Sequence, residues 1–269
     1  MSTEASFPLV WAPETPLPAL PARTKHKIVV DEIYKSFATE SGVLEVVGGV
    51  SFSVEAGKTL AIVGPSGCGK STLLGILAGF NPPDRGGVLI DGVPLRRANR
   101  KGIVISQQGS VFPWLTVEEN IAFGLHSGNR AERLEIAGQF TELVGLKSFE
   151  RRYPHELSGG MLKRVELARA LAVKPEVLYM DEPFSALDAL MSLRMRNELL
   201  QLLREHRQTL VLITHDVEEA IHLADRIVVL TPRPATIKTS FEVTLSHPRK
   251  LTSPEAQSLK EQVLSELGL

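Results

Sequence analysis

Apolar positions along the chain change period several times after about residue 27. Short runs rich in β-branched residues predict strands in KIVVDEIY, GVSFSV, KTLAIVG, GVLIDG, GIVIS, PEVLYMDEP, QTLVLITHD and DRIVVLTP. Helical spacing predicts a helix in KSTLLGILAG, a mainly helical stretch over about 117–172, and helices that begin near Ala189 and Val217. Short, continuously apolar strands joined by helices indicate a parallel sheet covered on both faces, so the predicted fold class is α/β.

This pattern divides the chain into three parts. Residues 1–25 contain five prolines, which remove backbone donors and fix φ, so an extended arm is expected there. Residues 26–245 carry the alternating strands and helices, with a helical subdomain inserted at about 108–172. Residues 246–269 are expected to add a short C-terminal helical appendage.

Composition narrows the classes of function. The chain has 30 basic and 31 acidic residues, so no positive excess attracts a polyanion and no nucleic-acid partner is predicted. No apolar run approaches the roughly 18 residues that span a bilayer, and no signal peptide is expected. The single cysteine, Cys68, excludes an intrachain disulfide and fits a reducing compartment.

A phosphate-binding loop is predicted at residues 64–71, GPSGCGKS, which match G-x-x-x-x-G-K-[ST] between a strand and a helix. Its glycines let backbone N–H groups surround phosphate oxygens, while Lys70 reaches the β- and γ-phosphates and the Ser71 hydroxyl ligates Mg²⁺. Cys68 is either a reactive thiol at a helix N-terminus or a small residue with an incidental thiol. The residues expected to contact ATP here are Gly64, Pro65, Ser66, Gly67, Cys68, Gly69, Lys70, Ser71 and Thr72.

Two acids end one predicted strand in VLYMDEP, and a histidine ends the next in VLITHD. An acid at the strand end beside a phosphate loop steers Mg²⁺, so Asp181 is the expected metal ligand. Glu182 projects to the opposite side and is expected to polarise the attacking water. His215 can hydrogen-bond the γ-phosphate or that water, or else cap or pack, and Asp216 is expected to cap the next helix.

A second phosphate-binding helix start is predicted at ELSGGM, residues 156–161. Each glycine costs a helix about 1 kcal/mol relative to alanine, but a bare first turn lets a phosphate approach its free N–H groups closely. Ser158 can cap the helix and donate its hydroxyl. Ser158, Gly159 and Gly160 are therefore assigned to nucleotide binding, which exceeds what a simple nucleotide kinase or GTPase requires.

Taken together, GPSGCGKST, ELSGG, VLYMDEPFSALD and LITHD resemble the ATP-binding subunits of ABC transporters, from about Lys27 to the C-terminus. The resemblance implies a P-loop NTPase sheet core of the ABC ATPase type, with an antiparallel β edge region and an inserted helical subdomain. It also implies that two chains enclose two ATP molecules with Mg²⁺. In that arrangement the ELSGG signature of one chain closes on the ATP held by the other.

The same resemblance assigns further residues by position. Gln107 in VISQQGSVFPW corresponds to the glutamine that joins the core to the helical subdomain and senses Mg²⁺ and the γ-phosphate, with Gln108 as the alternative. Phe37 in YKSF corresponds to the aromatic that stacks on adenine, with Tyr34 as the alternative, and either could instead be core. Residues 185–188, SALD, resemble the loop that meets the partner's phosphate loop. The implied catalytic residues are Glu182, His215, Lys70 and Gln107, and the implied metal ligands are Ser71, Gln107 and Asp181.

Within the family, VFPWLTVEENIAFGL and PRPATI resemble the nitrate, sulfonate and taurine importers. The implied function is an ATPase that drives import of a small anionic solute through a separate membrane permease. The implied partners are a second ATPase subunit in a homodimer or pseudo-symmetric pair, the integral permease subunits and, indirectly, a periplasmic or extracellular solute-binding protein. The chain would lie peripherally on the cytoplasmic face of the plasma or inner membrane. Alternatives are an export ATPase for lipid or lipoprotein and a non-transport ABC ATPase.

Two residues in these motifs have open roles. Trp114 lies near the expected permease contact but could equally be a packing aromatic. Met161 departs from the glutamine that is usual after LSGG, and its thioether cannot donate a hydrogen bond. The backbone N–H groups and helix dipole do not depend on this side chain, so ATP binding is expected to survive, and Met161 either slows hydrolysis or is neutral.

Overall fold

The structure is a computed structural model that describes residues 26–40, 42–107 and 109–269. The Pro-rich arm, 1–25, and the alternative glutamine Gln108 lie outside the described residues. In chain order the elements are β1 (His26–Thr39), β2 (Gly42–Glu55), β3 (Thr59–Val63), α1 (Lys70–Leu77), β4 (Arg85–Ile90), β5 (Val93–Pro94), β6 (Gly102–Ile105), α2 (Val117–Ala122), α3 (Arg130–Leu143), the 3-10 helix η1 (Pro154–Glu156), α4 (Gly159–Ala172), β7 (Val177–Asp181), α5 (Ala189–His206), β8 (Thr209–Ile213), α6 (Val217–Leu223), β9 (Arg226–Leu230), β10 (Ile237–Glu242) and α7 (Pro254–Leu267).

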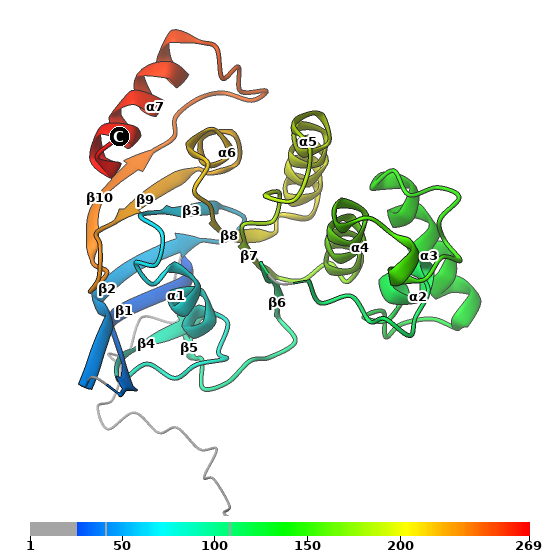
Figure 1. Cartoon of the computed structure of the whole chain (residues 1–269), viewed down its shortest axis with the longest axis horizontal. Helices are drawn as coiled ribbons and strands as arrows, with labels where there is room; N and C mark the ends of the chain where they lie inside the picture. Colours follow the sequence, from blue (N-terminus) through cyan, green and yellow to red (C-terminus); the bar gives the residue numbers. More distant parts are fainter. Residues whose placement is uncertain (1–25, 41, 108) are drawn as a thin grey trace, which may run out of the picture.

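A six-stranded sheet forms the centre of the molecule (Figure 1). Its order is β10-β9-β3-β8-β7-β6, and every pair is parallel except β10 with β9. Strands β3, β7 and β8 are buried at every residue, which explains why their sequences are continuously apolar rather than alternating. The predicted α/β class is confirmed.

A second, antiparallel sheet packs against one face of the first. Its four strands run in the order β2-β1-β4-β5, with irregular register along the β1–β2 pair. Helix α1 lies on the same face of the six-stranded sheet, and Ile33 of β1, Leu73 of α1 and Ile62 of β3 belong to one hydrophobic cluster. The antiparallel edge region that the resemblance implied is thus a separate sheet.

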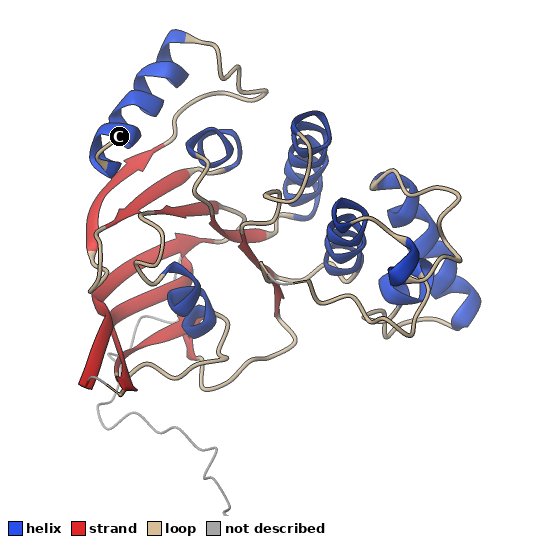
Figure 2. Cartoon of the chain, viewed as in Figure 1, coloured by secondary structure: helices blue, strands red, loops and turns tan. Residues whose placement is uncertain are grey.

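Helices α6 and α7 cover the opposite face of the six-stranded sheet (Figure 2). Ala61 and Val63 of β3 pack there against Ile221 of α6 and Val263 of α7, all fully buried. Strand β10 was not predicted from the sequence, because its residues alternate between half-buried and exposed and form no apolar run. The two-residue strand β5 was missed for the same reason, since both its residues are exposed.

Helices α2, α3 and α4 form a group beside the β6 edge of the six-stranded sheet (Figure 1). They lie within the segment predicted as a helical subdomain, and their apolar faces share a cluster with α5 and with buried residues of β7 and β8 such as Met180 and Leu212. Asparagine 120, fully buried in α2, donates to the carbonyls of Phe112 and Leu115 and fixes the loop that enters the group. None of the helices in the described part of the chain is long and apolar enough to cross a membrane.

Candidate nucleotide-binding and hydrolysis site

The phosphate loop connects the buried end of β3 to the first residue of α1. Gly67 and Gly69 have φ angles of 71° and 121°, in the left-handed region that glycine adopts without steric cost. A Cβ at Gly69 would lie 2.8 Å from Val46 Cγ1 and 3.0 Å from the Val46 carbonyl oxygen. The backbone of this loop is therefore packed so closely on β2 that only glycine fits at residue 69.

The side chain of Lys70 lies inside the loop and bonds to its backbone. This side chain is buried, and Nζ donates to the carbonyl oxygens of Gly64 at 2.8 Å and Pro65 at 2.9 Å. A charged ammonium held by two neutral carbonyls can still accept an anionic partner, because it has three donors and no acceptor. The lysine is thus positioned at the loop that the N-terminus of α1 completes.

A pocket of about 410 Å³ opens over this loop. Most of its residues come from the loop before α1, from the start of α1, and from the chain at or just after the ends of β6 and β7, which are labelled in Figure 1. Its lining residues are Phe37, Val46, Ser66, Gly67, Gly69, Lys70, Ser71, Thr72, Gln107, Asp181, Glu182 and Arg233. Most residues assigned to ATP and Mg²⁺ from the sequence are therefore brought together, although they come from four separate segments: Phe37, 66–72, Gln107 and 181–182.

Three loop residues assigned to the nucleotide do not line the pocket: Gly64, Pro65 and Cys68. The first two shape the loop by accepting the Lys70 hydrogen bonds. The Cys68 side chain is only 2% exposed and belongs to the hydrophobic cluster beneath the loop. Of the two sequence interpretations of Cys68, this burial favours the small packed residue, because a reactive thiol must be accessible.

The structure separates the two aromatic candidates for adenine. Phe37 lines the pocket and is 43% exposed, with Lys35 Nζ 5.3 Å from its ring centroid. Tyr34 lies instead under the Arg85 guanidinium, and a Cβ at Gly49 would come within 2.7 Å of its hydroxyl. Phe37 is thus the aromatic that a nucleotide in this pocket can reach.

Asp181 ends β7 at the floor of the pocket. Burial raises the pKa of this carboxyl above its ordinary value, while a hydrogen bond from Ser71 and the nearby charges of Lys70 and Lys163 oppose that rise. A buried carboxylate beside a hydroxyl is a pair of hard oxygen donors, the ligand type that Mg²⁺ prefers. The donor set therefore fits the magnesium ion assigned to it.

Glu182 lies between the two other side chains assigned to hydrolysis. Its Oε1 is 3.1 Å from His215 Nδ1, and its Oε2 accepts from Gln107 Nε2 at 3.2 Å. The backbone of Glu182 has a φ of 48°, which is uncommon for a residue with a side chain and occurs where surrounding structure enforces it. Gln107, Glu182 and His215 thus meet from β6, β7 and β8.

The segment that carries Gln107 is fixed by α4, through contacts that sequence reasoning missed. Lys163 Nζ donates to the Ser106 carbonyl at 2.6 Å, and Glu166 Oε1 accepts from the Ser110 N–H at 2.7 Å. Lys163 and Glu166 also form a buried ion pair of 3.0 Å. The sequence offered one signal of this pair: a lysine and a glutamate three residues apart lie on the same helix face and can pair, and charged residues are buried only when they are paired.

The predicted second phosphate-binding start begins α4 and lies outside the pocket. Ser158 Oγ accepts from the Met161 N–H at 3.3 Å, so the serine caps the helix as expected. A Cβ at Gly159 would meet no atom within 4 Å, whereas one at Gly160 would lie 3.3 Å from the Ala186 carbonyl oxygen. The signature is therefore beside the SALD loop of the same chain and open to solvent at Gly159.

Two pocket residues were not assigned from the sequence. Val46 supports the loop through its contact with Gly69, and Arg233 extends to within 3.7 Å of a Cβ at Gly67. Arg233 belongs to PRPATI, which was used only for the family resemblance. The residues around Arg233 carry no local signal of this approach, which depends on the order of the strands.

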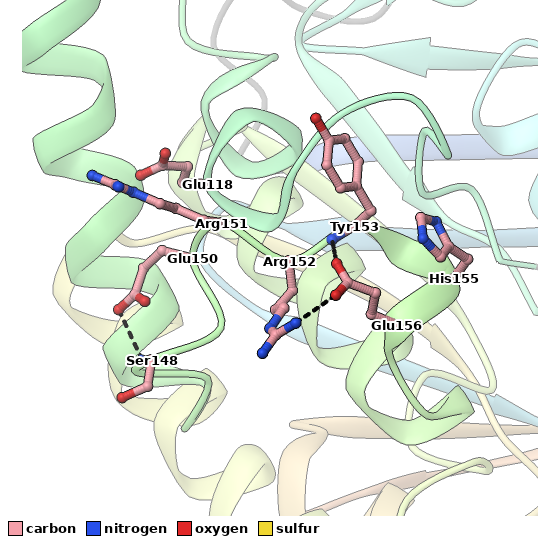
Figure 3. Close-up of a pocket in the computed structure, with 8 residues that line it drawn as sticks. All are labelled: Glu118, Ser148, Glu150, Arg151, Arg152, Tyr153, His155 and Glu156. Atoms are coloured by element: carbon pink, nitrogen blue, oxygen red, sulfur yellow. Dashed lines mark hydrogen bonds and ion pairs between the residues drawn. The ribbon is translucent and has the colours of Figure 1, made fainter.

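A larger hollow, of about 940 Å³, lies in the helical group (Figure 3). It has no glycine-rich loop. Two of its glutamates have partners within the hollow: Glu156 pairs with Arg152 at 2.6 Å, and Glu150 accepts from the Ser148 N–H at 3.0 Å. This hollow therefore lacks the features of a nucleotide site. Its lining residues are Glu118, Ser148, Glu150, Arg151, Arg152, Tyr153, His155 and Glu156.

Known proteins match both the sequence and the fold. The domain family described as ABC transporter matches residues 47–185. The aliphatic sulfonates import ATP-binding protein SsuB of Bacillus thuringiensis subsp. konkukian is 40% identical over 239 residues, which cover 89% of this chain and 95% of that protein. The nitrate import ATP-binding protein NrtD of Synechococcus elongatus is 40% identical over 225 residues, which cover 82% of each.

Solved structures give the same result. The dimeric structure of MJ0796, a bacterial ABC transporter cassette, matches with a TM-score of 0.75 at 28% identity and covers 80% of this chain and 98% of its own. A post-hydrolysis state of that cassette, bound to ADP and Pi, matches with a TM-score of 0.74.

A phosphate loop between β3 and α1, with two acids at the end of β7 in the same sheet, defines a P-loop NTPase. The chain belongs to the ABC transporter ATP-binding family. It is an ATPase with the ABC ATPase fold.

Proposed function

We propose that the chain is the ATP-hydrolysing subunit of an importer for a small anionic solute. One observation carries the proposal: two relatives that match over 82% or more of both chains are named for the import of aliphatic sulfonates and of nitrate. Both solutes are small anions. In this scheme a separate permease and a solute-binding protein select the solute, and this chain supplies the free energy of ATP hydrolysis.

In the proposed nucleotide complex, the loop N–H groups and Lys70 hold the phosphates at the start of α1. Phe37 stacks on the adenine, and Arg233 adds a second positive charge at the rim of the pocket. Ser71, Asp181 and Gln107 are the residues that would hold Mg²⁺, which offsets the charge of the β- and γ-phosphates.

Hydrolysis is assigned to the three side chains that meet at the end of β7. Glu182 accepts a proton from the water that attacks the γ-phosphate. His215 and Gln107 contact the two oxygens of that carboxylate and orient it toward the water. The bond between the β,γ-bridging oxygen and the γ-phosphorus breaks, which leaves ADP and inorganic phosphate.

The proposed active form contains two copies of the chain, each supplying its signature to the other's nucleotide. Ser158 and Gly159 are exposed and lie outside the chain's own nucleotide pocket, so they are free to contact a phosphate held elsewhere. ATP favours the closed dimer because the triphosphate makes contacts on both chains. Hydrolysis removes those contacts and lets the dimer open.

The proposed contact with the permease lies just after Gln107, on exposed aromatic residues of the helical group. Phe112, Trp114 and Phe123 form a cluster with ring-centroid distances of 5.4 and 4.5 Å from Phe112. Trp114 and Phe123 are 69% and 59% exposed, and clustered exposed aromatics are typical of protein interfaces. A cytoplasmic helix of the permease seated here would pass movement of the helical group to the membrane.

Glu182→Gln tests the hydrolysis scheme. The amide keeps the shape of the side chain but cannot take a proton, so turnover should fall by about 100-fold or more while ATP binding persists. Size-exclusion chromatography with ATP should then show a stable dimer. Unchanged turnover would remove Glu182 from its role.

Trp114→Ala tests the proposed partner. Affinity purification of the chain from membranes should recover an integral membrane protein, and the variant should lose that protein while its turnover without the partner stays unchanged. Val43→Ala is the matched control, because Val43 is 76% exposed on the antiparallel sheet. Recovery of a soluble protein or of nucleic acid instead would contradict the importer.

Uptake measurements separate the importer from the exporter. Cells that lack the chain should lose uptake of a sulfonate or nitrate and regain it with the wild-type chain, but not with Glu182→Gln. Normal uptake of both anions, together with a defect in lipid or lipoprotein export, would favour the exporter.

A further inference from the structure

A buried polar pair lies directly beneath His215, between β8 and α6. Thr214 and Glu219 are only 1% and 4% exposed, whereas the neighbouring His215 side chain is 63% exposed. Neither buried residue contacts the nucleotide pocket, and the hydrolysis scheme uses neither. Burying a carboxyl group is costly unless it makes a specific interaction.

Hydrogen bonds from this pair enclose residue 215 on both sides. The Thr214 hydroxyl donates to Glu219 Oε2 at 2.7 Å, and its own oxygen, Thr214 Oγ1, accepts from the Asp216 N–H at 3.0 Å. Asp216 Oδ1 accepts from the N–H groups of Glu218 at 2.9 Å and Glu219 at 3.2 Å, and so caps α6. His215 is therefore carried on a turn whose two flanking residues are tied to the first turn of α6.

Helix α6 itself is fixed by its neighbours at both ends. At its start, Arg196 of α5 donates to Asp216 Oδ2 at 3.1 Å. At its end, Arg249 Nη1 donates to the carbonyls of Ile221 at 2.8 Å and Ala224 at 2.6 Å. A helix held in this way gives Glu219 a fixed position from which to act on the turn.

Opposing effects act on the ionisation of the Glu219 carboxyl group. Its Oε1 is buried and has no hydrogen-bond partner among the described residues. Burial raises the pKa of this carboxyl to about 7, against the hydrogen bond from Thr214 and the positive charge of Arg196, with Asp216 and His215 the other nearby titratable groups. From α7, Lys260 faces this end of α6 but pairs with Glu218.

We propose that Glu219 is a positioning residue that sets the orientation of His215 through Thr214. This inference rests on the proposed role of His215 in ATP hydrolysis. The ionised carboxylate accepts the Thr214 hydroxyl proton, which leaves a lone pair of that oxygen facing the Asp216 N–H. A protonated Glu219 becomes a donor, competes with that N–H for the same oxygen, and loosens the turn.

Three variants of the full chain test the proposal by steady-state kinetics. Thr214→Val removes both hydrogen bonds with little change of shape, so kcat should fall about tenfold while KM for ATP changes little, because only the orientation of the histidine is lost. Thr214→Ser restores the hydroxyl and should recover the wild-type kcat. Glu219→Gln keeps an acceptor oxygen but cannot titrate.

The pH profile gives the readout that a merely structural residue would not affect. Wild-type kcat should rise between about pH 6 and about pH 8 as Glu219 ionises, and Glu219→Gln should remove that part of the rise. Glu218→Gln is the matched control: it alters the adjacent glutamate of α6, which is half-exposed and paired with Lys260, and should leave the profile unchanged.

An identical pH profile for Glu219→Gln and wild type, or an unchanged kcat in Thr214→Val, would overturn the proposal. If Thr214→Val fails to fold, the Glu219→Gln profile still decides. Glu182→Gln is measured alongside. Full turnover in that variant would contradict the proposed hydrolysis scheme, whereas its loss together with normal Thr214 and Glu219 variants would contradict only the positioning role.

Discussion

The starts of α1 and α4 are both suited to bind a phosphate, but they are built differently. At α1 the preceding loop packs on β2, a lysine lies inside it, and an acid, a glutamine and an aromatic complete the pocket within one chain. At α4 a serine caps the helix and Gly159 faces open space, outside the chain's own nucleotide pocket. The first site is thus formed by one chain, whereas the proposed second site needs a nucleotide held by a partner.

The difference shows in what each glycine is for. Gly69 is required by its own chain, because any side chain there would collide with Val46. Gly159 has open space around it, so no described residue explains why a glycine occupies a helical first turn. The proposed dimer supplies a reason, because a phosphate held by the partner would approach this turn from outside.

Of these variants, Lys70→Ala should have the largest effect, because it should greatly weaken ATP binding at the α1 site, which one chain forms by itself. Loss of the buried ammonium removes a charge-assisted contact to the phosphates, and ATP affinity should fall by about 100-fold or more. Fluorescent-nucleotide titration of the purified chain measures this. Lys58→Ala, at a lysine half-exposed and paired with Asp225 outside the pocket, is the control, and normal ATP binding by Lys70→Ala would contradict the assignment of the loop.

Gly69→Ala should damage the single chain next most strongly. The added methyl group lies 2.8 Å from Val46 Cγ1 at a φ of 121°, so the loop must move, at a cost of about 1–3 kcal/mol in stability. A lower melting temperature together with weaker ATP binding is expected by thermal denaturation and titration. If both stay at wild-type values, the loop does not need glycine at this position.

Gly159→Ala should have the opposite profile. A Cβ meets no atom of the chain, so stability should hold or rise by up to about 1 kcal/mol through helix propensity, and ATP binding by the single chain should not change. Turnover, which the proposed dimer requires, should fall by about tenfold because the methyl group blocks close approach of the partner's phosphate. Full turnover of this variant would contradict a contact between the start of α4 and the nucleotide.

Much of the α1 site could be predicted from the sequence because its signals are local. A strand, a glycine-rich loop and a helix follow one another within 59–77, and each has its own pattern. The acids at 181 and 182 follow an apolar run, which places them at the carboxyl end of a buried strand whatever the order of the strands. For the same reason the caps at Ser158 and Asp216 were found from residue type and position alone.

The remaining contacts could not be predicted, because they join segments far apart in the sequence. Nothing near Arg233 or Val46 indicates that they approach the phosphate loop, since that proximity depends on the order β9-β3-β8 and on how β2 packs. The bonds from Lys163 and Glu166 to the Gln107 segment also join residues far apart in the sequence. The burial of Cys68 was equally hidden, because the hydrophobic cluster beneath it comes from both sheets.

Met161→Gln should have the smallest effect of the series. The Met161 side chain is half-buried and packs, like Leu157 and Leu187, against the hydrophobic cluster of α2, α3 and α4, and only its N–H serves the capping serine. Glutamine gains a donor but loses apolar contact, so stability should fall by less than about 1 kcal/mol and turnover with the permease present should change by less than about twofold. Met161→Leu keeps the packing without sulfur and serves as the control. A rise of several-fold in turnover for Met161→Gln alone would mean that the thioether slows hydrolysis, and that the start of α4 acts through a side chain as well as through its backbone.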